Sequence, residues 1–228
     1  MKYLVIITAR GGSKGIPKKN IKHLNGKPLI QYSIDVAKGI SDIEDICFTS
    51  DSYEIIEVAK NGGLKVEFKR PEALSTDTAN SRDVMLHALG AYEKLHNKIY
   101  DAIILLQPTS PFRTLEQVKN CIKLYTNDLD MVVSVKAASA NPYYNLYEEE
   151  SGYLESSKKG NFTRRQDCPE VWEFNGAIYV INCNSLKAQS MKAFSKVKKF
   201  EMSEETSIDI DTPLDWKIAE FHLQDTKL

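Results

Sequence analysis

Short apolar runs alternate along the chain with segments whose apolar residues recur at the spacing of a helix. The runs contain several β-branched residues and predict strands at residues 3–8, 46–50, 64–68, 102–106 and 131–135. A helix is predicted at residues 81–96, where apolar side chains fall on one face. Strands that are apolar on both faces and alternate with helices are typical of a parallel sheet covered on both sides. We therefore expect an α/β fold with a doubly wound, mostly parallel sheet.

Capping patterns mark where other helices begin. Pro28 is expected in the first turn of one helix, where proline is tolerated. Thr114 is followed by Gln three residues later, and Thr212 by Asp at the same spacing, as in a capping box. The second pattern places residues 207–211 immediately before a helix.

The alternation of strands and helices is interrupted between residues 137 and 173. Turn-forming, acidic and Lys-Lys-Gly stretches punctuate this part of the chain, and strand patterns return at residues 177–182 and 197–202. We expect an inserted arm within a single domain that spans residues 1–228.

The first predicted strand leads into a glycine-rich basic loop. Residues 1–34 contain seven Lys or Arg and no Asp or Glu, and residues 9–20 read Ala-Arg-Gly-Gly-Ser-Lys-Gly-Ile-Pro-Lys-Lys-Asn. The glycine spacing matches neither the dinucleotide fingerprint nor the P-loop. Parallel sheets bind ligands beyond the carboxyl ends of their strands, and backbone N–H groups with cationic side chains suit a triphosphate. The alternative is a solvated basic loop without a ligand.

A pair of carboxylates occurs near the end of the chain. On an extended segment, Asp209 and Asp211 lie on one face and Ile208 and Ile210 on the other. Two neighbouring carboxylates repel each other unless a cation shares them, and a site of this kind with open positions suits Mg²⁺. Solvated acids at a strand end are the alternative. Together with the basic loop, the pair indicates metal-assisted chemistry on a nucleoside triphosphate.

The overall charge and the cysteine spacing exclude several classes of protein. Lys plus Arg is 30 and Asp plus Glu is 31, so the net charge of −1 predicts no nucleic-acid partner and no membrane-surface partner. The sequence shows neither a signal peptide nor an apolar run near the ~18 residues of a spanning helix, so we expect a cytoplasmic protein. The four cysteines form no C-x-x-C pair and are expected to be free thiols.

Four motifs resemble those of the acylneuraminate cytidylyltransferases, also called CMP-sialic acid synthetases. They are the basic loop at residues 9–20, Leu-Gln-Pro-Thr-Ser-Pro-Phe-Arg at 106–113, Asn-Gly-Ala-Ile-Tyr at 175–179 and Asp-Ile-Asp at 209–211. They stand in the family's order and cover nearly the whole chain. The resemblance implies a nucleotide-sugar-transferase-like, Rossmann-type fold and a homodimer that swaps an arm. It also implies that CTP and Mg²⁺ activate an acidic nine-carbon sugar, a nonulosonic acid.

The resemblance assigns expected roles residue by residue. The phosphate-binding and catalytic positions are matched by Arg10, Lys14 and Lys19. The rest of the nucleotide site is matched by Ala9, Asn20, Arg70, Ala79 and Ser81. A sugar contact is matched by Gln107, and the metal ligands by Asp209 and Asp211, the latter also catalytic. A turn-stabilising role for Gln107 and a structural ion pair for Arg70 remain alternatives.

One position departs from the family pattern. Many relatives carry Arg two residues before the Asn-Gly-Ala turn, whereas this chain has Glu173. The stretches 141–146 and 160–166 are similar to the branch that acts on bacterial sialic-acid-like sugars such as legionaminic acid. Arg165 is therefore a candidate for binding the sugar carboxylate, with a structural role as the alternative.

The expected reaction is in-line attack of the sugar's anomeric hydroxyl on the α-phosphorus of CTP, which expels pyrophosphate. Catalysis would rest on positioning and charge neutralisation, and the sequence indicates no general base. The four histidines are expected to be structural or solvent-facing. Three alternatives remain: a cytidylyltransferase for the eight-carbon sugar 3-deoxy-octulosonate, a nucleotidyltransferase for a sugar 1-phosphate, and a nucleotide-binding regulatory domain without turnover.

Overall fold

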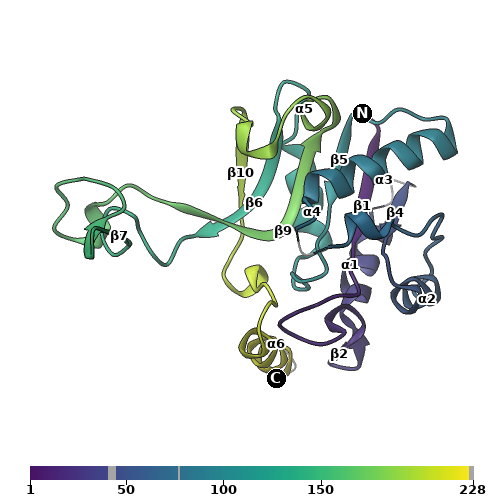
Figure 1. Cartoon of the computed structure of the whole chain (residues 1–228), viewed down its shortest axis with the longest axis horizontal. Coiled ribbons are helices and arrows are strands. Elements are labelled where there is room, and N and C mark those ends of the chain that lie inside the picture. The colour runs from purple at the N-terminus through teal and green to yellow at the C-terminus, as the bar shows by residue number, and fades with distance from the viewer. Residues whose placement is uncertain (41–44, 77, 226–228) are drawn as a thin grey trace.

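The computed structural model describes residues 1–40, 45–76 and 78–225. Its centre is a six-stranded sheet with the strand order β10-β6-β9-β5-β1-β4 (Figure 1). The strands are β1 (Tyr3–Thr8), β4 (Ile46–Thr49), β5 (Ala102–Leu105), β6 (Met131–Ala137), β9 (Trp172–Asn182) and β10 (Val197–Glu201). All neighbouring pairs are parallel except those of β9, which runs antiparallel between β5 and β6. The predicted mostly parallel sheet is confirmed.

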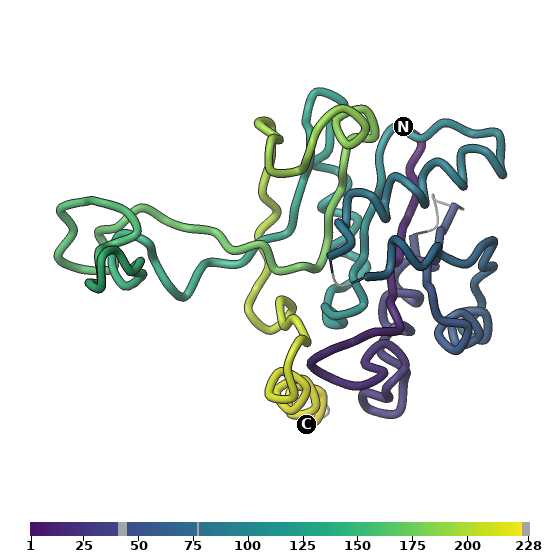
Figure 2. The backbone as a smooth tube through the Cα atoms, viewed as in Figure 1, coloured from purple at the N-terminus to yellow at the C-terminus, as the bar shows by residue number. Residues whose placement is uncertain are grey.

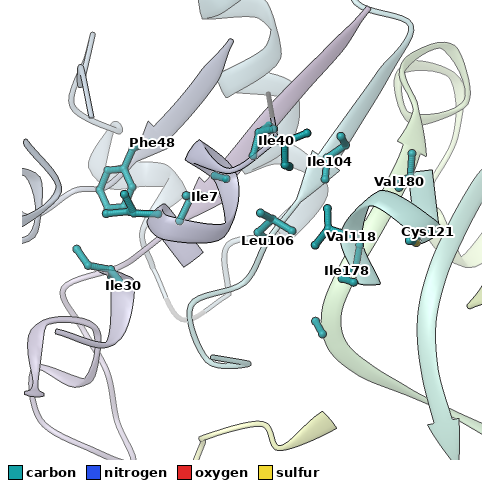
Figure 3. Packing of buried hydrophobic residues seen from close by; sticks show 14 of the residues in the cluster. Ile7, Ile30, Ile40, Phe48, Ile104, Leu106, Val118, Cys121, Ile178 and Val180 are labelled. Atoms are coloured by element: carbon teal, nitrogen blue, oxygen red, sulfur yellow. The ribbon is translucent and has the colours of Figure 1, made fainter. Parts of the chain in front are cut away.

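Helices cover both faces of the sheet. One face packs against α1 (Leu29–Lys38), α2 (Tyr53–Asn61) and α4 (Leu115–Lys123), and the other against α3 (Ser81–His96) and α5 (Cys183–Ala188). The alternation in β1 explains this, because Val5 and Ile7 enter the first cluster while Leu4 and Ile6 enter the second. Figure 3 shows the first cluster, in which Ile30 of α1 and Val118 of α4 pack toward the sheet.

The segment 64–68 does not form the predicted strand. It runs beside β4 without a ladder, and its neighbour Arg70 makes one backbone hydrogen bond there, from its N–H to Ser50 O at 2.8 Å. The alternation of apolar residues at 64–68 arises because this segment packs around the sheet edge. Leu64 joins the first core cluster, and Phe68 packs against the second.

The predicted helix starts are found in the structure. Thr114 caps α4 in a complete capping box with Gln117. Thr212 exchanges hydrogen bonds with Asp215 before α6 (Pro213–Asp225), as predicted. Pro28 differs slightly, because it precedes α1 as its cap residue instead of lying in the first turn.

A third apolar cluster joins the N-terminal loop to the C-terminal helix. A hairpin of β2 (His23–Leu24) and β3 (Lys27–Pro28) turns at Asn25-Gly26, both with positive φ. Leu24 of this hairpin and Ile16 of the basic loop are buried in one cluster with Ile210 and Trp216. The loop and α6 consequently lie beside each other below the carboxyl end of β1 (Figure 1).

Between β6 and β9 the chain leaves the sheet as a long arm (Figure 2). The arm carries a hairpin of β7 (Tyr147–Glu150) and β8 (Tyr153–Ser156), all of whose residues are exposed. It also carries one of five short 3-10 helices in the described chain, which are Lys19–Ile21, Glu72–Leu74, Arg165–Asp167, Met191–Ala193 and Glu205–Ser207.

The four cysteines are free, as predicted. In the part of the chain that the structure describes, no helix has the length and apolar character needed to cross a membrane.

Candidate active site

A cavity of about 550 Å³ opens at the carboxyl edge of the sheet, beyond β1 and β5. It brings together ten of the twelve site residues predicted from the sequence: Arg10, Lys14, Lys19, Asn20, Arg70, Ala79, Ser81, Gln107, Asp209 and Asp211. The other two lie elsewhere. Ala9 is buried beneath the loop, and Arg165 is exposed on the arm.

The basic loop is held from two sides. The buried Asn20 donates from Nδ2 to the backbone oxygen of Arg10 at 2.9 Å. On the other side, the N–H of Gly11 donates to Asp51 Oδ1 at 3.0 Å. The peptide group that joins Arg10 to Gly11 is thereby anchored at both its oxygen and its N–H, which fixes the backbone of Arg10 at the cavity wall.

Residues 208–211, the acidic segment, are anchored to the loop that follows β5. Ile210 N–H donates to Thr109 O at 2.8 Å, and Ser110 Oγ lies 3.4 Å from Asp209 Oδ1. Asp209 and Asp211 both face the cavity, while Ile208 and Ile210 belong to the third apolar cluster. The alternation predicted for this segment is therefore present.

The protein around the cavity raises the pKa of the Asp209 carboxyl above its ordinary value. Burial of the carboxyl away from water is the largest cause, and the negative charge of nearby Asp211 raises the pKa further. Hydrogen bonds from Thr109 and Ser110, together with the positive charge of Lys19, act in the opposite direction. A cation bound between the two carboxylates would relieve this unfavourable environment.

Lys19 connects the basic loop to the acidic segment. Its ammonium group donates to Ile210 O at 2.6 Å and to Asp211 Oδ1 at 2.9 Å, and its side chain is largely buried. The two backbones also approach closely, because a Cβ on Gly15 would lie 2.2 Å from Asp211 O. Only glycine fits this crossing without displacing a backbone.

Arg70 also lines the cavity, and its side chain is 4% exposed. Its guanidinium donates to Asp51 at 3.3 Å, to Ser75 Oγ at 3.0 Å and to Ala9 O at 3.4 Å. Burial lowers the pKa of Arg70, and Asp51 counteracts that effect. Arg70 therefore makes a structural ion pair and also faces the cavity, so both sequence interpretations fit its position.

Gln107 is placed by a buried arginine for which sequence reasoning assigned no role. Arg113 donates to the backbone oxygens of Gln107 and Ala177 and to Ser33 Oγ. Burial lowers the pKa of Arg113 to about 9, while the negative charge of Asp209 opposes that shift. Arg113 stands in the 106–113 motif, but the sequence carries no signal that it is buried.

Asn175 and Gly176, expected in a turn, lie instead within β9, beside a shift in its register with β6, and pack behind Asp209. Asn175 accepts from Ser134 Oγ at 2.6 Å and donates from Nδ2 to Ser207 Oγ at 2.8 Å, all buried. Gly176 has φ +72°, and a Cβ there would lie 3.1 Å from Gln107 Oε1 and 3.4 Å from Asp209 Oδ2. Asn175 thus connects β9 to Ser207, just before the acidic segment, and Gly176 leaves room for the side chains of Gln107 and Asp209.

The two carboxylates fit a magnesium site. Mg²⁺ is usually held by one or two carboxylates, with waters and substrate phosphates in its other positions. Asp209 and Asp211 share a cavity wall with three cationic side chains that would face such phosphates, Arg10, Lys14 and Lys19. Among residues 1–40, 45–76 and 78–225, no group of three or more His, Cys, Asp or Glu is placed to hold a metal ion. In the described chain, a metal ion at the two carboxylates would therefore need ligands from water or substrate.

Solved structures with this fold include nucleotide-binding enzymes. A CMP:2-keto-3-deoxy-manno-octonic acid synthetase solved in complex with CTP matches with a TM-score of 0.73 and 20% identity, covering 100% of both chains. A 4-diphosphocytidyl-2C-methyl-D-erythritol synthase from Anaerococcus prevotii matches with a TM-score of 0.67 and 14% identity, covering 98% of this chain and 96% of that one. At these identities the likeness shows the fold alone.

Sequence relatives are more similar. The chain is 37% identical to the post-translational flagellin modification protein B of Campylobacter coli, over 99% of this chain and 96% of the relative. It is 35% identical to the CMP-N,N'-diacetyllegionaminic acid synthase of Campylobacter jejuni, over 96% and 93%. An N-acylneuraminate cytidylyltransferase of Streptococcus agalactiae is 35% identical over 93% of this chain, which spans about half (51%) of that relative's length. The family model described as cytidylyltransferase matches residues 4–224, and the chain belongs to the cytidylyltransferase family.

Proposed function

We propose that this protein transfers CMP from CTP to the anomeric hydroxyl of a nonulosonic acid and releases pyrophosphate. The observation that carries the proposal is the convergence of Arg10, Lys14, Lys19 and Arg70 with Asp209 and Asp211 on one cavity. Cations on one wall suit a triphosphate, and a carboxylate pair beside them suits the divalent ion that accompanies it.

The residues of the basic loop bind and orient the triphosphate. Arg10, Lys14 and Lys19 balance its negative charge, and the anchored loop holds them ready before the substrate arrives. Arg70, Ala79 and Ser81 line the same cavity and receive the cytosine ring. Gln107, whose backbone Arg113 fixes, binds the acceptor sugar.

Asp209 and Asp211 would hold Mg²⁺. When bound, the ion would stabilise negative charge on the α-phosphate and the leaving pyrophosphate. Lys19 would exchange its contact with Asp211 for one with phosphate oxygens, since its ammonium group lies between the loop and the acidic segment. None of the described residues that line the cavity is a histidine, and the proposal assigns no general base.

The acceptor is proposed to be an N-acylated sugar of the legionaminic or sialic acid type. The names of two relatives from Campylobacter jejuni and Legionella pneumophila, 35% and 33% identical, support legionaminic acid. Glu173 lies 3.7 Å from Lys136 across the base of the arm, so its negative charge is paired within the chain. A cation for the sugar carboxylate must therefore come from another residue, and Arg165 is the proposed one.

We also propose that the active unit is a homodimer in which the arm of one chain completes the site of the other. Tyr147, Tyr153 and Leu154 on the arm hairpin are 52%, 77% and 71% exposed. Aromatic side chains bury roughly 150–250 Å² each, so such a patch supplies the apolar core of an interface. Arg165 lies on the arm and outside the cavity of its own chain, which supports a role in the partner's site.

Pyrophosphate release tests the proposed function. The purified protein is incubated with CTP and Mg²⁺ and with each of a panel of acceptors: N-acetylneuraminic, legionaminic and pseudaminic acids, 3-deoxy-octulosonate and a sugar 1-phosphate. We expect release with one or more of the three nonulosonic acids. Release only with 3-deoxy-octulosonate or only with the sugar 1-phosphate would favour those alternatives. CTP binding without turnover on any acceptor would favour a regulatory domain.

A further inference from the structure

Asp51 does not line the cavity, but it contacts two groups beside it, the basic loop and Arg70. It follows β4 by two residues, at the carboxyl edge of the sheet, and its side chain is 21% exposed. A single oxygen, Oδ1, accepts from Gly11 N–H at 3.0 Å and from the Arg70 guanidinium at 3.3 Å. One carboxylate oxygen therefore bonds both to the backbone of the basic loop and to Arg70.

On the loop side, Asp51 fixes the backbone directly after Arg10. Gly11 lies against the start of α2, where an added Cβ would meet Ser52 Cβ at 3.2 Å and Asp51 Oδ2 at 3.6 Å. A side chain at this position would crowd Ser52, which would have to shift by a few tenths of an ångström. Without the acceptor, the Gly11 N–H loses the partner that orients the turn beside Arg10.

On the arginine side, Asp51 balances a buried charge. The Arg70 side chain is 4% exposed, and the same guanidinium nitrogen that pairs with Asp51 also donates to Ala9 O. Arg10 is close enough for its positive charge to lower the pKa of Arg70, so the two cations repel each other. A negative charge between them permits both to face the same cavity.

We propose that Asp51 is a positioning residue that holds the triphosphate loop and Arg70 in one binding frame for a nucleoside triphosphate. The proposal rests on the proposed function. It assigns Asp51 no contact with the substrate. Its effect belongs to the binding of CTP, so its loss is expected in KM and Kd more than in kcat.

The direction in which one substitution changes CTP affinity distinguishes a positioning role from a simple effect of charge. Asp51→Asn removes a negative charge near an anionic ligand, so an account based on charge alone expects CTP to bind more tightly. Positioning predicts weaker binding, because Arg70 loses its counterion. The loss of CTP affinity is expected to be larger for Asp51→Ala, because Gly11 then also loses its hydrogen-bond acceptor. Removing a hydrogen bond to a charged group should raise Kd about tenfold or more.

The experiment measures CTP binding by calorimetry and steady-state kinetics for Asp51→Asn, Asp51→Ala and a matched control. The control is Asp45→Asn. Asp45 precedes β4 at the amino end of the strand, pairs with Lys98 at 2.8 Å, and neither residue lines the cavity. We expect Kd and KM for CTP to rise in both Asp51 variants, with kcat within about threefold of wild type. The control is expected to match wild type in all three values.

Asp51→Asn binding CTP as tightly as wild type, or more tightly, would overturn the proposal. So would equal losses in Asp51→Asn and Asp45→Asn. If Asp51→Ala does not fold, Asp51→Asn alone decides by the same criterion. If wild-type protein binds no CTP, the proposed function fails. The role of Asp51 is then tested by measuring the binding of inorganic triphosphate and the hydrogen exchange of the Gly11 amide. Values in Asp51→Asn that equal those of wild type would count against positioning.

Discussion

Replacing Gly15 with alanine tests the crossing between the basic loop and the acidic segment. A Cβ at Gly15 would lie 2.2 Å from Asp211 O, whereas ordinary contacts of this kind begin at 3.4 Å. The obstacle is backbone, which cannot rotate away as a side chain does. The two segments must therefore separate by roughly 1 Å, a shift large enough to cost ~10²-fold in rate when it displaces groups at a reacting centre.

The magnitude follows from the contacts that cross this gap. Lys19 bonds to Ile210 O at 2.6 Å and to Asp211 Oδ1 at 2.9 Å, and neither bond survives such a separation unchanged. Overpacking a tight site costs about 1–3 kcal/mol of unfolding free energy. For a chain of this size, each kcal/mol lowers Tm by roughly 2–4 °C.

The same loop contains a matched control. A Cβ on Gly12 meets nothing within 4 Å, so Gly12→Ala should behave as wild type in both assays. Gly15→Ala should lose ~10²-fold in kcat/KM for pyrophosphate release and unfold at lower temperature. Equal activity and equal Tm for the two variants would refute the reasoning that the loop and the acidic segment must touch here.

Four further results are expected. Asp211→Asn should lower kcat by ~10² or more with the fold intact, and wild-type turnover should stop in EDTA; near-normal turnover in EDTA contradicts the metal role. CTP should exceed UTP, ATP and GTP in kcat/KM by up to ~10⁴, because a pocket that hydrogen-bonds one base leaves its groups unpaired with another; equal use of UTP counts against the Arg70 pocket. Light scattering should report twice the chain mass, and mixing Asp211→Asn with Arg165→Ala chains should restore some activity; confirmed mixed dimers without activity would exclude the shared site. Asn175→Ala should cost about 1–3 kcal/mol in urea unfolding, because buried Ser134 and Ser207 lose partners; a change below about 0.5 kcal/mol contradicts this.

Local patterns predicted the elements that local chemistry determines. The capping box at Thr114 is complete in the structure, and the alternation at 208–211 places both aspartates toward the cavity. The same rule failed at residues 64–68. An alternating pattern reports which side chains are buried, and it does not distinguish a paired strand from a segment that packs around a sheet edge.

The basic loop was predicted as an anion site because parallel sheets bind ligands beyond the carboxyl ends of their strands. The carboxylate pair was linked to that site by chemistry, because a triphosphate suits the loop and a divalent cation suits the pair. The argument from strand ends also applies to Asp51, which follows a predicted strand, yet an isolated acid carries no further signal. Arg113 and Asn175 act through burial and hydrogen bonds to residues distant in sequence. Those contacts exist only once the chain is folded, so the motifs indicated importance without indicating a physical role.

An isotope experiment tests the central claim most directly. The nonulosonic acid that supports turnover is prepared with the heavy oxygen isotope in its anomeric hydroxyl, and the product with CTP and Mg²⁺ is analysed by mass spectrometry. Direct attack of the sugar on the α-phosphorus of CTP predicts that the label stays in the oxygen that bridges sugar and CMP. A product that lacks the label, or labelled pyrophosphate, would contradict the proposed transfer.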